Sequence, residues 1–220
     1  MNKKKVLQIL LAFLLIPSFC TFSQNQNSGG EHYLFPDFRE AEVFLHTGKT
    51  QHIQLNYNLL TEEMVFVQNG QFLAISNPET LDSIRIEDRK FVQIKEHFFE
   101  QIGDHPVPLL IRHKKKLLPT GKSTGFGTSQ TTAVDNITNI VSTGKVYELK
   151  LQGDFTLMPE SSFHILYNNE LHRFNNYREI SKIFPGQAPA LKQFLKSEKI
   201  DFAHQDDVKR VLDFLFQSIE

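Results

Sequence analysis

The segment TGKS contains the ending of a phosphate-binding loop. In the complete motif, backbone N–H groups and a lysine such as Lys122 hold the phosphates of a nucleotide. The motif also requires a glycine five positions before Gly121, and Lys116 stands there. Because the phosphate cradle needs that glycine and a preceding parallel strand, we expect no nucleotide-binding site.

Three further residues have side chains that bind metals. His97, Glu100 and His105 lie close together in the sequence, and on a helix the first two would share a face. Residues 97–102 have the pattern of a strand, however, where a spacing of three places side chains on opposite faces. We therefore interpret all three as exposed polar residues beside a turn. The other histidines show no zinc-type spacing: His32, His46, His52, His113, His164, His172 and His204.

The remaining polar motifs are weak. No Gly-x-Ser-x-Gly nucleophile elbow occurs, and the segment GFGTS at 125–129 comes nearest. A Ser-His-Asp site assembled from distant segments stays open. The run RHKKK at 112–116 favours a solvated face or an edge strand protected by lysine, with contact to an anionic surface as the alternative. We therefore predict no catalytic residue, no cofactor-binding residue, no metal ligand and no bound cofactor.

Length and composition indicate one globular domain, or one domain with a small appendage. The chain has 220 residues, of which 40% are hydrophobic, and this length allows a substantial core. It contains 20 Phe and no Trp, so most aromatic rings are expected to be packing material. Basic and acidic residues number 24 and 25, and without the three lysines near the N-terminus the chain is mildly acidic. Such a charge balance argues against nucleic acid as a partner.

The N-terminus has the pattern of a secretory leader. Three lysines precede the apolar stretch VLQILLAFLLIPSF, which is shorter than the roughly 20 residues of a spanning helix. Small residues at Thr21 and Ser23 favour cleavage before Gln24, so residues 1–23 are predicted to be a signal peptide. The alternatives are a permanent anchor and lipidation of Cys20, which the large Phe19 disfavours. Cleavage would leave a mature chain without cysteine, whose stability depends on packing alone.

The remaining chain divides into three parts. Residues 24–40 are predicted to be a flexible lead-in, residues 41–174 an antiparallel β-rich domain, and residues 175–220 helices packed on the sheet. A mobile loop is expected over 119–143, which is rich in Gly, Ser and Thr. Two-residue turns at Asn69-Gly70 and Asn168-Asn169 predict hairpins. The predicted strands cover 41–45, 51–57, 63–67, 71–75, 83–87, 90–94, 97–102, 107–113, 145–151, 163–167 and 171–174.

The C-terminal part changes to a helical period. Asn176 and Glu179 form a capping box before a helix that extends to Phe184. A second helix begins near Pro189, and a third covers about 205–218. Strands followed by helices predict an α+β fold: an antiparallel β-meander with a curved sheet, followed by a cluster of about three short helices.

Several segments resemble a group of uncharacterised exported proteins of the Bacteroidota. The leader ending TFSQN is similar to their signal peptides, and the segment from GKTQHIQLNYN to IEDRKFV is similar to their N-terminal meander. The segment ISKIFPGQAPALKQFLKSEKIDFAHQDDVKRVLDFL resembles their helical tail. The resemblance implies an exported protein. The group has no assigned activity, so it implies no functional residue.

We therefore expect an exported protein of the cell envelope, located in the periplasm, at the outer membrane or outside the cell. The expected function is a non-enzymatic binding or scaffolding domain, with the sheet as platform and the 119–143 loop as contact. Its partner would be an envelope protein, a glycan or a lipid, and the mature chain would have no transmembrane segment. Two alternatives are a hydrolase of envelope or extracellular polymers and a carrier of an apolar ligand such as a lipid.

Overall fold

A computed structural model describes residues 30–103, 107–119, 123–124, 127–128, 147–148 and 155–217. It has an α+β fold, as predicted. The strands are β1 (Arg39–Leu45), β2 (Thr50–Asn58), β3 (Glu63–Gln68), β4 (Gln71–Ala74), β5 (Leu81–Ile86), β6 (Arg89–Ile94), β7 (His97–Ile102), β8 (Leu109–Arg112), β9 (Lys115–Pro119), β10 (Ser123–Thr124), β11 (Gly127–Thr128), β12 (Phe155–Pro159), β13 (Ser162–Tyr167) and β14 (Glu170–Phe174). The helices are α3 (Tyr177–Ile183), α4 (Ala188–Ser197) and α5 (Gln205–Gln217), with 3-10 turns η1 (Pro78–Thr80) and η3 (Pro185–Gln187).

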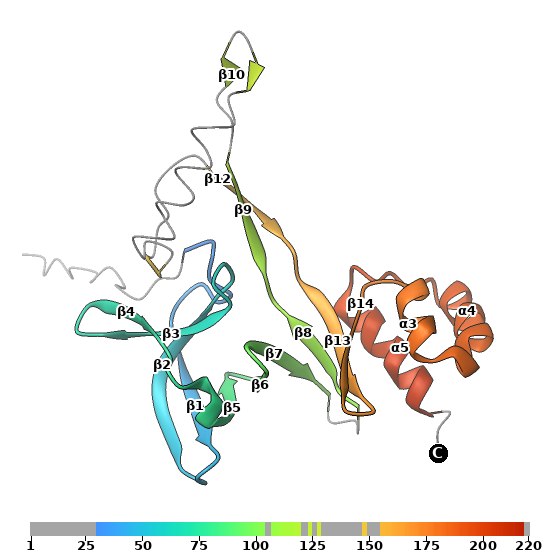
Figure 1. Ribbon diagram of the computed structural model, residues 1–220, viewed down its shortest axis with the longest axis horizontal. Coiled ribbons are helices and arrows are strands. Elements are labelled where there is room, and N and C mark those ends of the chain that lie inside the picture. The colour runs from blue at the N-terminus through green and yellow to red at the C-terminus, as the bar shows by residue number, and fades with distance from the viewer. Residues whose placement is uncertain are drawn as a thin grey trace, which may run out of the picture.

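One antiparallel sheet extends through the described chain. Its strand order is β14-β13-β8-β7-β6-β5-β1-β2-β3-β4. Strands β1–β6 gather at one end of the molecule and the C-terminal helices at the other, with the β8 and β13 strands between them (Figure 1). The order departs from a simple meander at two points, because β1 lies between β2 and β5, and β8 lies next to β13.

Two predicted hairpins are confirmed by their backbone conformation. Asn69 and Gly70 both have positive φ, 52° and 74°, between β3 and β4. Asn168 and Asn169 have φ of 53° and 62° between β13 and β14. Paired positive φ values match the right-handed twist of the flanking strands, which explains why these sequences form tight turns.

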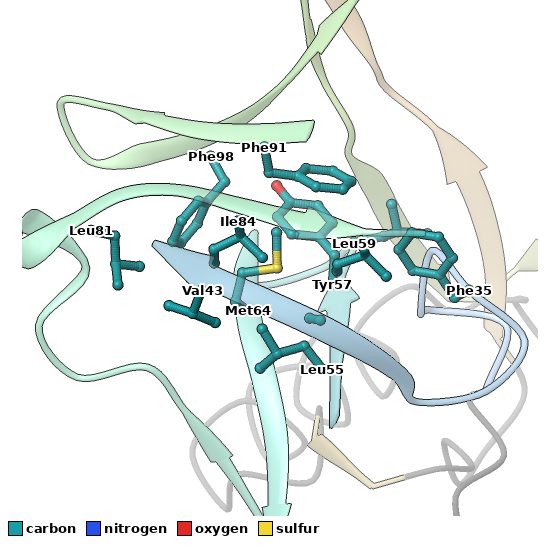
Figure 2. Close-up of a cluster of buried hydrophobic side chains, with 12 residues drawn as sticks. Phe35, Val43, Leu55, Tyr57, Leu59, Met64, Leu81, Ile84, Phe91 and Phe98 are labelled. Atoms are coloured by element: carbon teal, nitrogen blue, oxygen red, sulfur yellow. The ribbon is translucent and has the colours of Figure 1, made fainter. Parts of the chain in front are cut away.

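The N-terminal half of the sheet curls around its own core. The rings of Tyr57 on β2 and Phe91 on β6 stack with centroids 6.2 Å apart, although β1 and β5 separate the two strands. Three strand spacings in a flat sheet would separate them by about 14 Å. The predicted curvature is therefore confirmed. Figure 2 shows the side chains that fill this N-terminal core: Phe35, Ala41, Val43, Leu55, Tyr57, Leu59, Met64, Leu81, Ile84, Ile86, Phe91 and Phe98.

A second core lies between the helices and the other end of the sheet. Its strand residues are Leu109, Ile111, Ile165 and Phe174, and its helical residues include Leu191. The predicted cap of α3 is confirmed, because Asn176 Oδ1 accepts the N–H of Glu179 at 3.0 Å. Glu179 in turn accepts the N–H of Asn175, one residue earlier than in the usual capping box.

A two-stranded ribbon extends beyond the sheet and was not predicted. The ladder of β8 with β13 continues into the ladder of β9 with β12 after a break at 113–114 and 160–161. Within the predicted loop 119–143, Pro119 ends β9 and β10 pairs with β11, and the other residues lie outside the described residues. Of the predicted strand 145–151 only residues 147 and 148 are described, and neither belongs to a strand.

The described part of the predicted lead-in, from residue 30 onward, differs from the expectation. Tyr33, Phe35 and Phe38 are buried, and β1 begins at Arg39. The side chain of Asn56 holds this segment, because it accepts the N–H of Phe35 at 3.1 Å and donates to the carbonyl of Phe35 at 2.8 Å. A flexible segment is therefore the wrong description of residues 33–38. The signal peptide predicted over 1–23 lies outside the described residues.

Both cores lie on one continuous sheet, so we expect them to unfold together. Leu55→Ala in the N-terminal core and Leu191→Ala in the helical core should each lower the free energy of unfolding by about 2–5 kcal/mol. Urea denaturation followed by circular dichroism should show one transition for each variant. Leu166→Ala, at a side chain that is 44% exposed, is the control and should change stability by less than about 0.5 kcal/mol. Two separate transitions, each moved by only one variant, would contradict this expectation.

Candidate functional site

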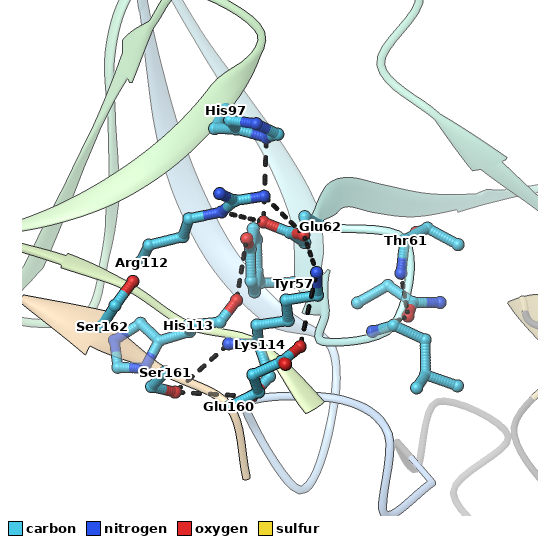
Figure 3. Close-up of polar contacts among 12 residues, drawn as sticks. Tyr57, Thr61, Glu62, His97, Arg112, His113, Lys114, Glu160, Ser161 and Ser162 are labelled. Carbon is cyan, nitrogen blue, oxygen red and sulfur yellow. Dashed lines mark hydrogen bonds and ion pairs between the residues drawn. The ribbon is translucent and has the colours of Figure 1, made fainter. Parts of the chain in front are cut away.

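The basic tract at the end of β8 binds two buried glutamates on opposite faces of the sheet. Successive side chains of a strand alternate between faces. Arg112 and Lys114 therefore reach Glu62 on one face, while His113 reaches Glu100 on the other. Figure 3 shows the first of these groups, at the point where the ribbon leaves the sheet. We call the two groups the Glu62 cluster and the Glu100 cluster.

The Glu62 cluster is an ion-pair network around one carboxylate. Arg112 donates through Nε to Oε2 and through Nη2 to Oε1, the latter at 2.9 Å. Lys114 Nζ lies 3.4 Å from Oε1, and His97 Nδ1 lies 3.7 Å from Oε2. Burial would raise the pKa of Glu62, but the hydrogen bond and charge of Arg112, with Lys114 and His97, lower it below its ordinary value.

A strained turn places Glu62 in this network. The backbone N–H of Glu62 donates to the Asn58 carbonyl at 2.8 Å, and Asn58 Oδ1 accepts the N–H of Leu60 at 2.9 Å. Glu62 has a φ of 62°, a left-handed conformation that costs an L-residue about 1 kcal/mol. The ion pairs and the turn hydrogen bonds hold the residue in this conformation, which directs its carboxylate toward β8.

The Glu100 cluster lies between the two hydrophobic cores. Arg89 donates to Glu100 through Nε at 2.7 Å and Nη2 at 2.6 Å, and His113 Nε2 lies 2.5 Å from Oε2. The side chain of Glu100 is only 4% exposed. Burial would raise the pKa of Glu100, but the hydrogen bonds from His113 and Arg89 outweigh it and lower the pKa to about 2.

Cross-strand register sets the position of Glu100. It lies opposite Phe91 of the N-terminal core on β6 and opposite Ile111 of the helical core on β8. The Arg89 guanidinium lies 5.0 Å from the ring centroid of Phe35 and 5.6 Å from that of Phe91. One edge of the cluster borders a pocket of about 500 Å³ whose lining residues are Asp88, Arg89, Glu100, Gln101, Ile102, Gly103 and Gln205.

The structure corrects two interpretations of the sequence. Glu100 was expected to be an exposed residue beside a turn, but it is buried and ionically bonded. The basic run was expected to form a solvated face or an edge strand protected by lysine, but Arg112, His113 and Lys114 bind acidic side chains. The side chains of His97 and Glu100 bind different partners and are not brought together, and His105 lies outside the described residues.

The fragment of a phosphate-binding loop, TGKS, lies mostly outside the described residues. Lys116 lies exposed on β9 and Ser123 begins β10, while residues 120–122 between them are not described. Among the described residues, no group of three or more His, Cys, Asp or Glu side chains is placed to hold a metal ion.

A serine and a histidine on β13 form a pair that the sequence interpretation missed. Ser162 Oγ and His164 Nε2 are 2.8 Å apart, and both residues are buried. Their spacing of two residues on a strand, which places both on one face, was the available signal. Burial lowers the pKa of His164 to about 4, with smaller contributions from Arg173, Arg112 and His97. Within the described chain, Nδ1 of His164 has no hydrogen-bond partner.

Comparison with known proteins gives no relative. No protein-family model, no curated protein and no solved structure matches the chain. In the described part of the chain, no helix has the length and apolar character needed to cross a membrane.

The lowered pKa of Glu100 predicts a specific dependence of stability on pH. Ionised Glu100 stabilises the folded chain above its unfolded pKa of 4.5, and this stabilisation is lost as pH falls from 4.5 toward 2. At neutral pH, Glu100→Gln should lower the free energy of unfolding by about 3 kcal/mol, because Arg89 and His113 lose a charged partner. Urea denaturation at a series of pH values should show that the difference in free energy of unfolding between wild type and variant decreases as pH falls from 4.5 toward 2.

Glu96→Gln is the matched control for this series. Glu96 is exposed on the turn before β7, so its substitution should leave stability unchanged at every pH. If the loss of unfolding free energy in Glu100→Gln stays constant down to low pH, Glu100 does not stabilise the fold through its charge.

Proposed function

We propose that this protein is an exported, non-enzymatic domain of the bacterial cell envelope that binds another envelope component. The observation that carries the proposal is the saturation of its buried acids by cations of its own chain. Glu62 and Glu100 each accept charge-assisted hydrogen bonds, and the pKa of each is lowered. A carboxylate in this state is a weak base and cannot donate a proton at neutral pH, so both glutamates serve to hold the fold.

Export is supported by the sequence of the N-terminus. Three lysines followed by a short apolar stretch and small residues before Gln24 are typical of a cleaved leader. A periplasmic, outer-membrane or extracellular location follows from this pattern, and the expected partner is an envelope protein, glycan or lipid.

A second candidate function is hydrolysis of an envelope or extracellular polymer. The hydrogen bond between Ser162 and His164 favours it, because a serine nucleophile is activated by an adjacent base. Two observations weigh against it. Both side chains are more than nine-tenths buried, and no carboxylate of the described chain bonds Nδ1 of His164 to orient the ring.

Export is tested by reading the N-terminus of the protein made in a bacterial host. We expect the chain in the envelope or medium to begin at Gln24. Leu11→Arg should keep the uncleaved chain in the cytosol, because a charge interrupts the apolar stretch, whereas Leu11→Ile should be exported normally. A soluble cytosolic wild-type product that still begins with Met1 would overturn the envelope assignment.

Binding without turnover is tested with purified protein and isolated envelope fractions. We expect saturable co-sedimentation with one fraction, either peptidoglycan or outer-membrane vesicles, and no release of soluble product. Ser162→Ala should leave the co-sedimentation unchanged, and so should the control Ser161→Ala at the neighbouring exposed serine. Release of product by the wild type that is abolished in Ser162→Ala but persists in Ser161→Ala would establish the hydrolase instead.

A further inference from the structure

An apolar pocket opens at the end of the curled N-terminal half of the sheet. Its volume is about 330 Å³, at the lower end of the range for small-molecule sites. The walls come from strands β1 to β5 and from the chain that connects β4 with β5. The lining residues are Val43, Leu45, Gln51, Ile53, Leu55, Phe66, Ala74, Ile75, Ser76, Asn77, Thr80 and Leu81.

The pocket reaches the hydrophobic core. Val43, Leu55 and Leu81 are core residues with exposures of 3%, 0% and 7%, and Figure 2 shows them on one side of the cluster. Partly buried side chains of Leu45, Phe66 and Ile75 pack against the same cluster. At the solvent end of the pocket, the lining residue Ile53 is 36% exposed. The pocket therefore has an apolar interior that extends from the surface to the core.

The polar part of the lining is uncharged. Gln51, Ser76, Asn77 and Thr80 supply amide and hydroxyl groups, and the described lining includes no Asp, Glu, Lys, Arg or His. The 500 Å³ pocket contains Asp88, Arg89 and Glu100, so the two sites differ in chemistry. Burial of an unpaired charge is costly, and an ionised group would find no counter-charge among these residues. A ligand for this pocket is therefore neutral where it is buried.

We propose that this pocket binds the acyl chain of a lipid whose head group is neutral and bears hydroxyl or ester oxygens. The interior is mostly aliphatic, with Phe66 as the one aromatic ring in the described lining, which favours a flexible aliphatic chain over a stacked aromatic ligand. The head group would remain near Gln51 and Asn77, whose amides can donate to ester oxygens and accept from hydroxyls. This inference rests on the proposed binding function and specifies its ligand.

The test uses the full chain after export and 1-monododecanoylglycerol as the probe, below its micelle concentration. Isothermal titration calorimetry should give saturable binding with one ligand per chain. Ile53→Asp should weaken binding at least tenfold, because it places a charge at an exposed wall of the pocket. Ser76→Phe, at an exposed position on the rim, should weaken it similarly by blocking the entrance. Circular dichroism would verify that both variants are folded.

The matched control is Leu166→Asp, which makes a similar change at another exposed apolar side chain on a different strand. It should bind as the wild type does. No saturable binding, or binding that Ile53→Asp and Ser76→Phe leave unchanged, overturns the inference. Saturable retention on peptidoglycan without lipid binding would overturn it while leaving the proposed envelope-binding function in place. Binding of apolar peptides but not of the glyceride would overturn it in favour of a protein partner.

Discussion

Two ionised glutamates, Glu62 and Glu100, are buried on opposite faces of one sheet. The positions of the surrounding strands depend on the need to neutralise both carboxylates. A buried carboxylate is costly unless cations and hydrogen-bond donors surround it. Here a single tract, Arg112 to Lys114, supplies donors to both acids because adjacent side chains of a strand point to opposite faces. The strand that carries this tract therefore pairs with β7, which holds Glu100, and its end approaches the turn that holds Glu62, where the N–H of Lys115 donates to the Leu59 carbonyl.

This requirement specifies register more than it adds stability. Replacing a buried ion pair by apolar side chains is often neutral, so the pairs alone are weak evidence for a stable fold. A shift of β8 by one residue, however, would direct Arg112 and Lys114 away from Glu62 and turn His113 away from Glu100. Glu62 would then lose Arg112 and Lys114, and Glu100 would keep Arg89 but lose His113. The Glu100 cluster thereby fixes the strand on which Ile111 of the helical core lies, next to Phe91 of the N-terminal core.

Most of the strands could be predicted because their signals are local. Alternation and turn residues such as Asn69-Gly70 need no information from elsewhere in the chain. Strand β9 was missed because the segment KKLLP shows no alternation of apolar and polar residues. Its partner β12 was missed as well, because the strand in this part of the chain was predicted over 145–151, just before it. The ion pairs could not be predicted, since Arg112 and Glu62 are separated by 50 residues and meet only through the sheet order. Burial of Phe35 depends likewise on Asn56, 21 residues away.

The electrostatic surroundings of His164 bear on the choice between binding and catalysis. A general base must gain a proton during the reaction, and its strength falls as its pKa falls. For His164 that proton would create a buried cation near Arg173 and Arg112, which is why its pKa is about 4. In a serine hydrolase a carboxylate on the far nitrogen stabilises this cation, and within the described chain Nδ1 has no such partner. The two buried glutamates, Glu62 and Glu100, already form ion pairs with Arg112, Lys114, Arg89 and His113. The buried charges around Glu62 and Glu100 therefore hold strands in place, and this supports the proposal that a partner is recognised through the neutral, apolar pocket.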